Sequence, residues 1–221
     1  MKYDPNKYHR RSIRLKRYDY SRAGAYFVTI CTRGRECVLT NPVVAGIIGD
    51  VWTALPEWFP TIALDEFVVM PNHVHLVVWL QWGEGAGASP APTLAADDVG
   101  ATLAVAPEAI VPSDRVIPPP DAVNLKPILG NVVGSFKSLV FTVYYDWVQE
   151  HDPNRRAKFW QRNYYEHTVR DERELSAIRR YIRDNPLQWK LDRDNPQNLR
   201  RLPPPVTVDD YLEDILALPQ E

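Results

Sequence analysis

The chain has 221 residues, of which 45% are hydrophobic, so it can form one domain with extensions or two small domains. Its two cysteines exclude a disulfide framework, and without a CxxC pair they do not indicate a zinc ribbon. The basic, polar beginning does not resemble a signal peptide, and no apolar run reaches membrane-spanning length, so we expect a cytoplasmic protein.

The net charge of −2 is unevenly distributed along the chain. Residues 83–124 and residues 203–221 each carry a net charge of −5, which leaves +8 on the remainder. A basic body favours a phosphate-rich partner, although surface charge that serves only solubility would give the same count.

Residues 1–22 form a basic arm in which tyrosines alternate with lysines and arginines. Cations that pair with backbone phosphates and tyrosines that stack on bases predict a nucleic-acid-binding arm. A disordered basic terminus is the alternative. The candidate DNA contacts in this arm are Arg10, Arg11, Arg14, Lys16 and Arg17.

The rest of the chain predicts an α+β domain. Its order of strand, helix, strand, strand, helix, strand is that of a ferredoxin-like split βαβ unit, with an antiparallel sheet and two helices on one face. A further helix follows, and an Ala/Pro-rich stretch interrupts the domain as a flexible insertion. The predicted strands are 25–32, 62–70, 73–80 and one within 158–169; the helices are 43–58, 125–150 and 171–185; the insertion is 83–124.

The second and third strands form a hairpin around a Pro-Asn turn, and the third begins with His73-Val74-His75. Side chains two apart in a strand point to the same face, so both imidazoles project side by side. Two neutral imidazoles in this arrangement are suited to a divalent metal. The alternative is a pair of hydrogen-bonded core histidines.

Within the predicted helix at 125–150, the run Gly134-Ser135-Phe136-Lys137-Ser138 combines a small residue, two hydroxyls and a cation. This group is suited to a phosphate, which makes Lys137 a candidate DNA contact. Alternatively, Gly134 permits close packing of the helix on the sheet.

The last predicted helix has an N-terminal capping pattern at Asp171 and Glu174, and it should end at Asn185 because Pro186 disfavours helical geometry in its predecessor. Tyr181 and Asn185, four residues apart, lie on one side at the edge of the buried stripe. The flank expected to face solvent carries three further candidate DNA contacts, namely Arg179, Arg180 and Arg183.

Three motifs in this order resemble those of the REP-associated tyrosine transposases, relatives of the single-strand transposases of the HUH superfamily. They are Pro71-Asn72-His73-Val74-His75, residues 159–167 (FWQRNYYEH) and residues 178–186 (IRRYIRDNP). The resemblance covers most of residues 8–82 and 125–190. It implies a ferredoxin-like fold, a divalent metal, a tyrosine nucleophile and single-stranded DNA that carries a palindromic hairpin as the substrate.

By the same resemblance, His73, His75 and Asn185 are metal ligands and Tyr181 is the nucleophile. Ligands of nitrogen and oxygen without thiolate favour Mg²⁺ or Mn²⁺ over structural zinc. Attack by Tyr181 on a phosphodiester would give a 5′-phosphotyrosine and a free 3′-hydroxyl, which keeps the reaction reversible. Arg162, within the second motif, is a further candidate DNA contact.

Several alternatives remain open at this level. Tyr164 and Tyr165 compete with Tyr181 for the nucleophile, and Glu166 with His167 could orient a ligand or only stabilise a strand end. A hairpin-DNA-binding module without catalysis, or a hydrolase of small phosphoesters, would use some of the same residues. We expect a monomer without a small-molecule substrate, divided into the arm 1–22, a catalytic domain 23–189 and an acidic tail 190–221.

Overall fold

The computed structural model describes residues 22–81, 126–154, 158–192 and 194–198. Residues 1–21 of the predicted arm, the insertion 83–124 and the acidic segment 203–221 lie outside the described residues. Both cysteines are described and are free thiols, with Cys31 buried and Cys37 exposed. Among the described helices, none is long and apolar enough to cross a membrane.

A four-stranded antiparallel sheet has the strand order β2-β3-β1-β4. Helix α2 connects β1 to β2, and helix α3 follows β3 and precedes β4, so the predicted ferredoxin-like α+β fold is confirmed. The strands are β1 (Gly24–Cys31), β2 (Ile62–Met70), β3 (His73–Leu80) and β4 (Tyr165–Thr168). The helices are α2 (Pro42–Trp58), α3 (Leu129–His151) and α4 (Glu172–Gln188), with short 3-10 turns η1 (Arg33–Arg35) and η2 (Val38–Thr40) after β1.

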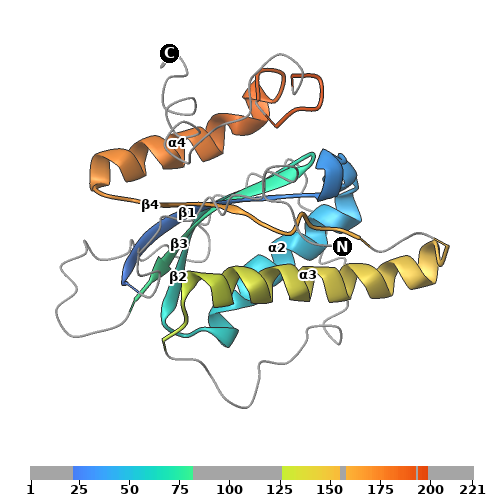
Figure 1. The fold of residues 1–221 in the computed structure, drawn as a ribbon, viewed down its shortest axis with the longest axis horizontal. Helices are drawn as coiled ribbons and strands as arrows, with labels where there is room; N and C mark the ends of the chain where they lie inside the picture. Colours follow the sequence, from blue (N-terminus) through green and yellow to red (C-terminus); the bar gives the residue numbers. More distant parts are fainter. Residues whose placement is uncertain (1–21, 82–125, 155–157, 193, 199–221) are drawn as a thin grey trace, which may run out of the picture.

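The two faces of the sheet are covered by different helices (Figure 1). Because side chains alternate along a strand, Tyr26, Val28 and Ile30 of β1 join the core beneath α2 and α3. Ala25 and Phe27 instead join the smaller core beneath α4. The extra helix therefore covers the face that a ferredoxin-like unit leaves open.

Helix α3 presents Val132, Val133 and Phe136 to the larger core. A Cβ atom added at Gly134 would meet no atom within 4 Å among the described residues. The interpretation of Gly134 as a site of close helix–sheet packing is therefore wrong.

Helix α4 begins as predicted, because the Asp171 carboxylate accepts a hydrogen bond from the backbone N–H of Glu174 at 2.8 Å. The predicted end at Asn185 is wrong by nearly one turn, since the helix continues through Pro186 to Gln188. Trp189 packs against the core beneath α4, and this contact offsets the helix hydrogen bond that proline cannot donate.

Candidate functional site

The two histidines of β3 lie side by side on the face covered by α4. His73 pairs across the sheet with Cys31, and His75 pairs with Thr29, so both imidazoles share that face with Phe27. Both side chains are fully buried, and their Nε2 atoms are 2.9 Å apart. The predicted juxtaposition of the imidazoles is present.

Hydrogen bonds at the Nδ1 atom of each imidazole orient the two rings so that their Nε2 atoms face each other. The Asn72 side-chain N–H₂ donates to the carbonyl oxygens of Arg35 (3.1 Å) and Asp194 (2.7 Å), so its Oδ1 must face His73 Nδ1, at 2.9 Å. His73 therefore carries its proton on Nδ1, and its Nε2 lone pair points at His75. The Thr29 hydroxyl lies 2.8 Å from His75 Nδ1 and orients the second ring.

Burial lowers the pKa of both His73 and His75 well below the usual range, because the charged imidazolium is poorly solvated there. His75 is lowered further by its neighbour His73. Both rings are therefore neutral at pH 7, and neutral imidazole is the form that binds a metal.

Helix α4 brings the predicted tyrosine to this pair. The Tyr181 hydroxyl lies 3.2 Å from His75 Nε2, and the Tyr181 ring contacts Phe27 edge-on. Asn185, one helical turn later, is buried with an exposed fraction of 3%, and its Oδ1 accepts no hydrogen bond from the described residues. The four residues singled out in the sequence thus belong to one region, with the phenol directly at the imidazole pair.

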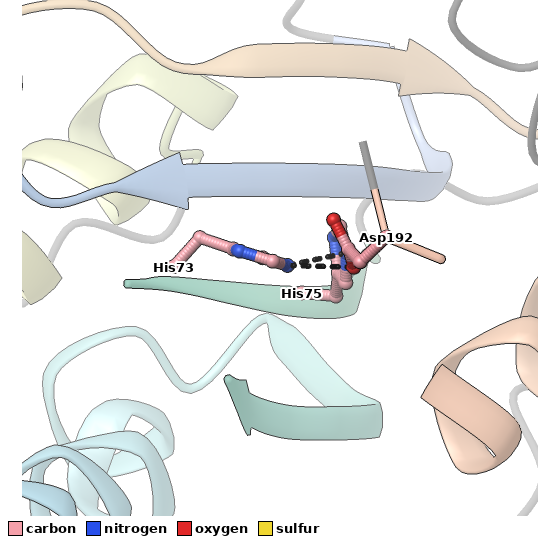
Figure 2. A group of neighbouring side chains, drawn as sticks. All are labelled: His73, His75 and Asp192. Atoms are coloured by element: carbon pink, nitrogen blue, oxygen red, sulfur yellow. Dashed lines mark hydrogen bonds and ion pairs between the residues drawn. The ribbon is translucent and has the colours of Figure 1, made fainter. Parts of the chain in front are cut away.

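Sequence reasoning missed Asp192, which follows α4. Its carboxylate lies 3.8 Å from His73 Nε2, and one ligand atom from each of His73, His75 and Asp192 lies within 4.8 Å of the other two (Figure 2). The Asn185 side chain hydrogen-bonds Asp192. Burial, followed by repulsion from Asp194, raises the pKa of Asp192 to about 7. Asp192 lay beyond the predicted end of the helix, and nothing in its spacing from the histidines pointed to the site.

The residues present fit a divalent cation. Two imidazole nitrogens and oxygens of an amide and a carboxylate form a mixed nitrogen and oxygen donor set without thiolate. The Asn185 and Asp192 oxygens that accept no hydrogen bond from the described residues are buried polar atoms, which are costly unless something satisfies them. A bound cation would satisfy both.

The turn after α4 is fastened to the end of the sheet where β1 ends and β3 begins. Arg35, in η1, forms an ion pair with the buried Asp194, and Asn72 donates to the Asp194 carbonyl oxygen. Asn72 therefore orients His73 and also ties down the turn that carries Asp192. These contacts join segments more than 100 residues apart in the sequence.

A second contact fastens the middle of α4 to β2 and corrects the prediction for Arg179. The Arg179 guanidinium forms two hydrogen bonds with the Asp65 carboxylate, at 2.8 and 2.7 Å, and Trp79 Nε1 donates to the same carboxylate at 2.8 Å. The Arg179 side chain is 18% exposed, so the expectation that it faces solvent is wrong. Asp65 lies on the same face of β2 as Ala63, which packs in the core beneath α4, and the β2–β3 register shifts just after this point, between Leu64 and Phe67.

The other predicted DNA contacts are distributed over the surface. Arg180 and Arg183 are exposed on α4, and Arg183 lies 3.5 Å from Glu66. Arg162 is exposed beyond the end of β1. Lys137 donates to the carbonyl oxygens of Gln161 and Arg162, and burial lowers its pKa to about 8. Candidates of the basic arm, Arg10, Arg11, Arg14, Lys16 and Arg17, lie outside the described residues.

The competing tyrosines occupy different faces of the sheet. Tyr164 packs against the core beneath α2 and α3, away from the histidines. Tyr165 pairs with Thr29, which itself pairs with His75, so it shares the histidine face two strands away.

His167 hydrogen-bonds Glu174 at 2.9 Å and thereby ties β4 to the first turn of α4.

Comparisons with known proteins give one close relative in sequence. An uncharacterized protein of Haemophilus influenzae (strain Rd) is 30% identical over 200 residues, which cover 86% of this chain and 96% of that protein. No family model matches the chain. A structure of a REP-associated tyrosine transposase bound to a REP hairpin aligns with a TM-score of 0.48 and 15% identity over 81% of this chain and 76% of the other. A crystal structure from Deinococcus radiodurans R1, provisionally named a transposase, aligns with a TM-score of 0.34 and 18% identity. This alignment covers 77% of this chain and 95% of the other.

Proposed function

The chain belongs to the same family as the Haemophilus influenzae protein, and we propose that it is a metal-dependent enzyme that cleaves and rejoins single-stranded DNA. The observation that carries the proposal is the position of the Tyr181 hydroxyl, 3.2 Å from His75 Nε2, which is itself 2.9 Å from His73 Nε2. A nucleophilic hydroxyl beside a neutral pair of metal-binding nitrogens is the arrangement that attack on a phosphodiester requires.

In this proposal His73, His75 and Asn185 hold Mg²⁺ or Mn²⁺, ions for which nitrogen and oxygen donors without thiolate are suited. When bound, such an ion supplies charge stabilisation for a phosphodiester under attack. The Asn72 and Thr29 side chains orient the two rings, and α4 covers the face of the sheet that carries them.

Tyr181 attacks the scissile phosphorus, so that a bond forms between its oxygen and phosphorus while the bond to the 3′ oxygen breaks. The phenolic proton passes through solvent to the departing 3′ oxygen, which leaves as a hydroxyl. The product is a 5′-phosphotyrosine, and attack on it by a 3′-hydroxyl reverses the step and rejoins a strand.

The substrate we propose is a single strand beside a hairpin, which follows from the motif resemblance to REP-associated tyrosine transposases. The exposed guanidinium groups of Arg162, Arg180 and Arg183 would contact its phosphates, with the basic arm 1–22 as an additional contact. Lys137 is a further candidate once its carbonyl partners exchange for phosphate oxygens.

The test is adduct formation on a labelled single-stranded oligonucleotide that carries a hairpin, with Mg²⁺ or Mn²⁺ present. We expect wild-type protein to give a covalent adduct that survives denaturation, and Tyr181→Phe to give none while it binds the oligonucleotide as wild type does. Tyr165→Phe is the matched comparison on the same face, and it should retain the adduct. Adduct from Tyr181→Phe but not from Tyr165→Phe would reassign the nucleophile, and binding without any adduct would favour a non-catalytic hairpin-binding module.

A further inference from the structure

The turn after α4 adds an acidic side chain to an otherwise neutral set of donors. His73 and His75 are neutral, and Asn185 is an amide, so the three residues named by the sequence motifs bring no negative charge to a divalent ion. Within the described part of the chain, Asp192 is the acidic residue that lies close enough to both histidines to bind the same metal ion. Mg²⁺ and Mn²⁺ favour carboxylate ligands over neutral nitrogen donors.

The Asp192 carboxylate is positioned and unsatisfied in the manner of a ligand. Its side chain is 4% exposed, and its Oδ2 lies 3.8 Å from His73 Nε2 and accepts no hydrogen bond from the described residues. Its Oδ1 accepts from the Asp194 backbone N–H, which leaves Oδ2 directed at the imidazole pair (Figure 2). A neutral imidazole does not form an ion pair, so this buried carboxylate lacks a cationic partner at the histidine side.

The surrounding turn holds Asp192 in place. Arg35 forms an ion pair with Asp194, and the Asn198 side chain donates to the carbonyl oxygens of Lys190 and Asp192 at 2.8 and 2.9 Å. Because the main chain of this turn is held in place and the Asp194 N–H contacts Asp192 Oδ1, little ordering is needed when a cation binds, which favours affinity.

We infer that Asp192 is a direct ligand of the divalent ion, so that the metal centre consists of His73, His75, Asn185 and Asp192. This inference rests on the metal site of the proposed function, but it does not depend on DNA cleavage. It also predicts that Asp192, beyond the end of α4, is part of the metal centre and that a chain ending at α4 would bind the ion weakly.

The test is Mn²⁺ binding without DNA, measured from the electron paramagnetic resonance signal of free Mn²⁺ and by titration calorimetry. We expect wild type to bind one ion per chain, and Asp192→Asn, which keeps the size of the side chain, to bind about 10–100-fold more weakly. Asp146→Asn removes the same charge from the exposed surface of α3, on the other side of the sheet, and should bind as wild type does.

Circular dichroism and thermal melting without metal check that Asp192→Asn folds. If it does not fold, Asn198→Ala loosens the same turn from the surface, and weaker Mn²⁺ binding by that variant would support the inference. Wild-type affinity in Asp192→Asn, or in Asn198→Ala where the first variant is unfolded, would overturn it, as would absence of Mn²⁺ binding by wild type. Wild-type binding of Mn²⁺ without any DNA adduct would instead contradict the proposed function and leave the ligand assignment standing.

Discussion

The face of the sheet beneath α2 and α3 is filled with large apolar side chains, whereas the face beneath α4 combines a smaller apolar core with buried polar groups. On the first face, Trp52 stacks on Phe67 with ring centroids 5.0 Å apart and meets Phe136 edge-on. On the second, His73, His75 and Asn185 are equally buried. Burial of apolar area stabilises a fold, and burial of polar groups costs free energy unless they are satisfied. The first face therefore supplies most of the apolar stabilisation, whereas the second carries the cost of buried polar groups, which the proposed metal would offset.

The largest expected effect breaks the stabilising face. Trp52→Ala should lower the free energy of unfolding by about 3–5 kcal/mol, because it leaves a cavity between Phe67 and Phe136. Urea unfolding followed by circular dichroism measures the change. At temperatures where the variant remains folded, its Mn²⁺ affinity should be that of wild type. A loss of affinity without a loss of stability would contradict the division between the faces.

The next effect concerns the contact that fastens α4 to β2. Asp65→Asn should cost about 3 kcal/mol, because it leaves the Arg179 guanidinium poorly paired in a largely buried position. Urea unfolding at pH 7 checks the value, with Asp146→Asn as the exposed control. A cost no larger than that of the control would show that this ion pair does not hold the helix.

The same carboxylate gives a pH dependence. Burial alone would raise the pKa of Asp65, but hydrogen bonds from Arg179 and Trp79 outweigh burial and hold it below its ordinary value of 3.8. A lowered pKa stabilises the fold above the unfolded value, and this contribution is lost as the pH falls through the folded value. Wild type should therefore lose more stability than Asp65→Asn when the pH is lowered from about 5 to below 3. Parallel losses in the two proteins would contradict the assignment.

A third effect is the gain in stability on metal binding, which should depend on residues of the face beneath α4 and not on those of the other face. At a free Mn²⁺ concentration about 100 times the dissociation constant, wild type should gain about 2.7 kcal/mol of stability, and chelation should reverse the gain. His75→Asn should lose the gain, whereas Trp52→Phe, on the other face, should keep it. Thermal melting with and without Mn²⁺ measures both. An equal metal gain in His75→Asn would exclude that histidine as a ligand.

The smallest expected effect is on Mn²⁺ affinity when the His75 ring loses its hydrogen bond to Thr29. Thr29→Val keeps the shape of the side chain but removes the hydroxyl that lies 2.8 Å from His75 Nδ1. We expect Mn²⁺ affinity to fall about tenfold, which is about 1.4 kcal/mol. Titration calorimetry checks the value, and unchanged affinity would show that the Thr29 hydroxyl is not needed to orient the His75 ring.

The sequence predicted the strands, the hairpin and the histidine face because alternation in a strand is a local property. Helical spacing in the same way placed Tyr181 beside Asn185. Arg179 and Asp192 were misjudged or missed for non-local reasons. The contact that buries Arg179 joins it to Asp65, 114 residues earlier in the chain, and helical spacing does not predict such a partner. The packing of Trp189 carries the helix beyond Pro186 toward the turn with Asp192.

The hairpin turn at Pro71 and Asn72 has a consequence for the chemistry of the protein. Because the side-chain period of a strand is two, a shift of β3 by one residue would turn His73 and His75 toward Trp52 and expose the site to Val74 and Leu76 instead. The length of this short connection therefore selects which side of one strand meets the tyrosine. A single inserted residue there would replace the histidine pair beside Tyr181 with aliphatic side chains, although His73 and His75 would still be present in the sequence.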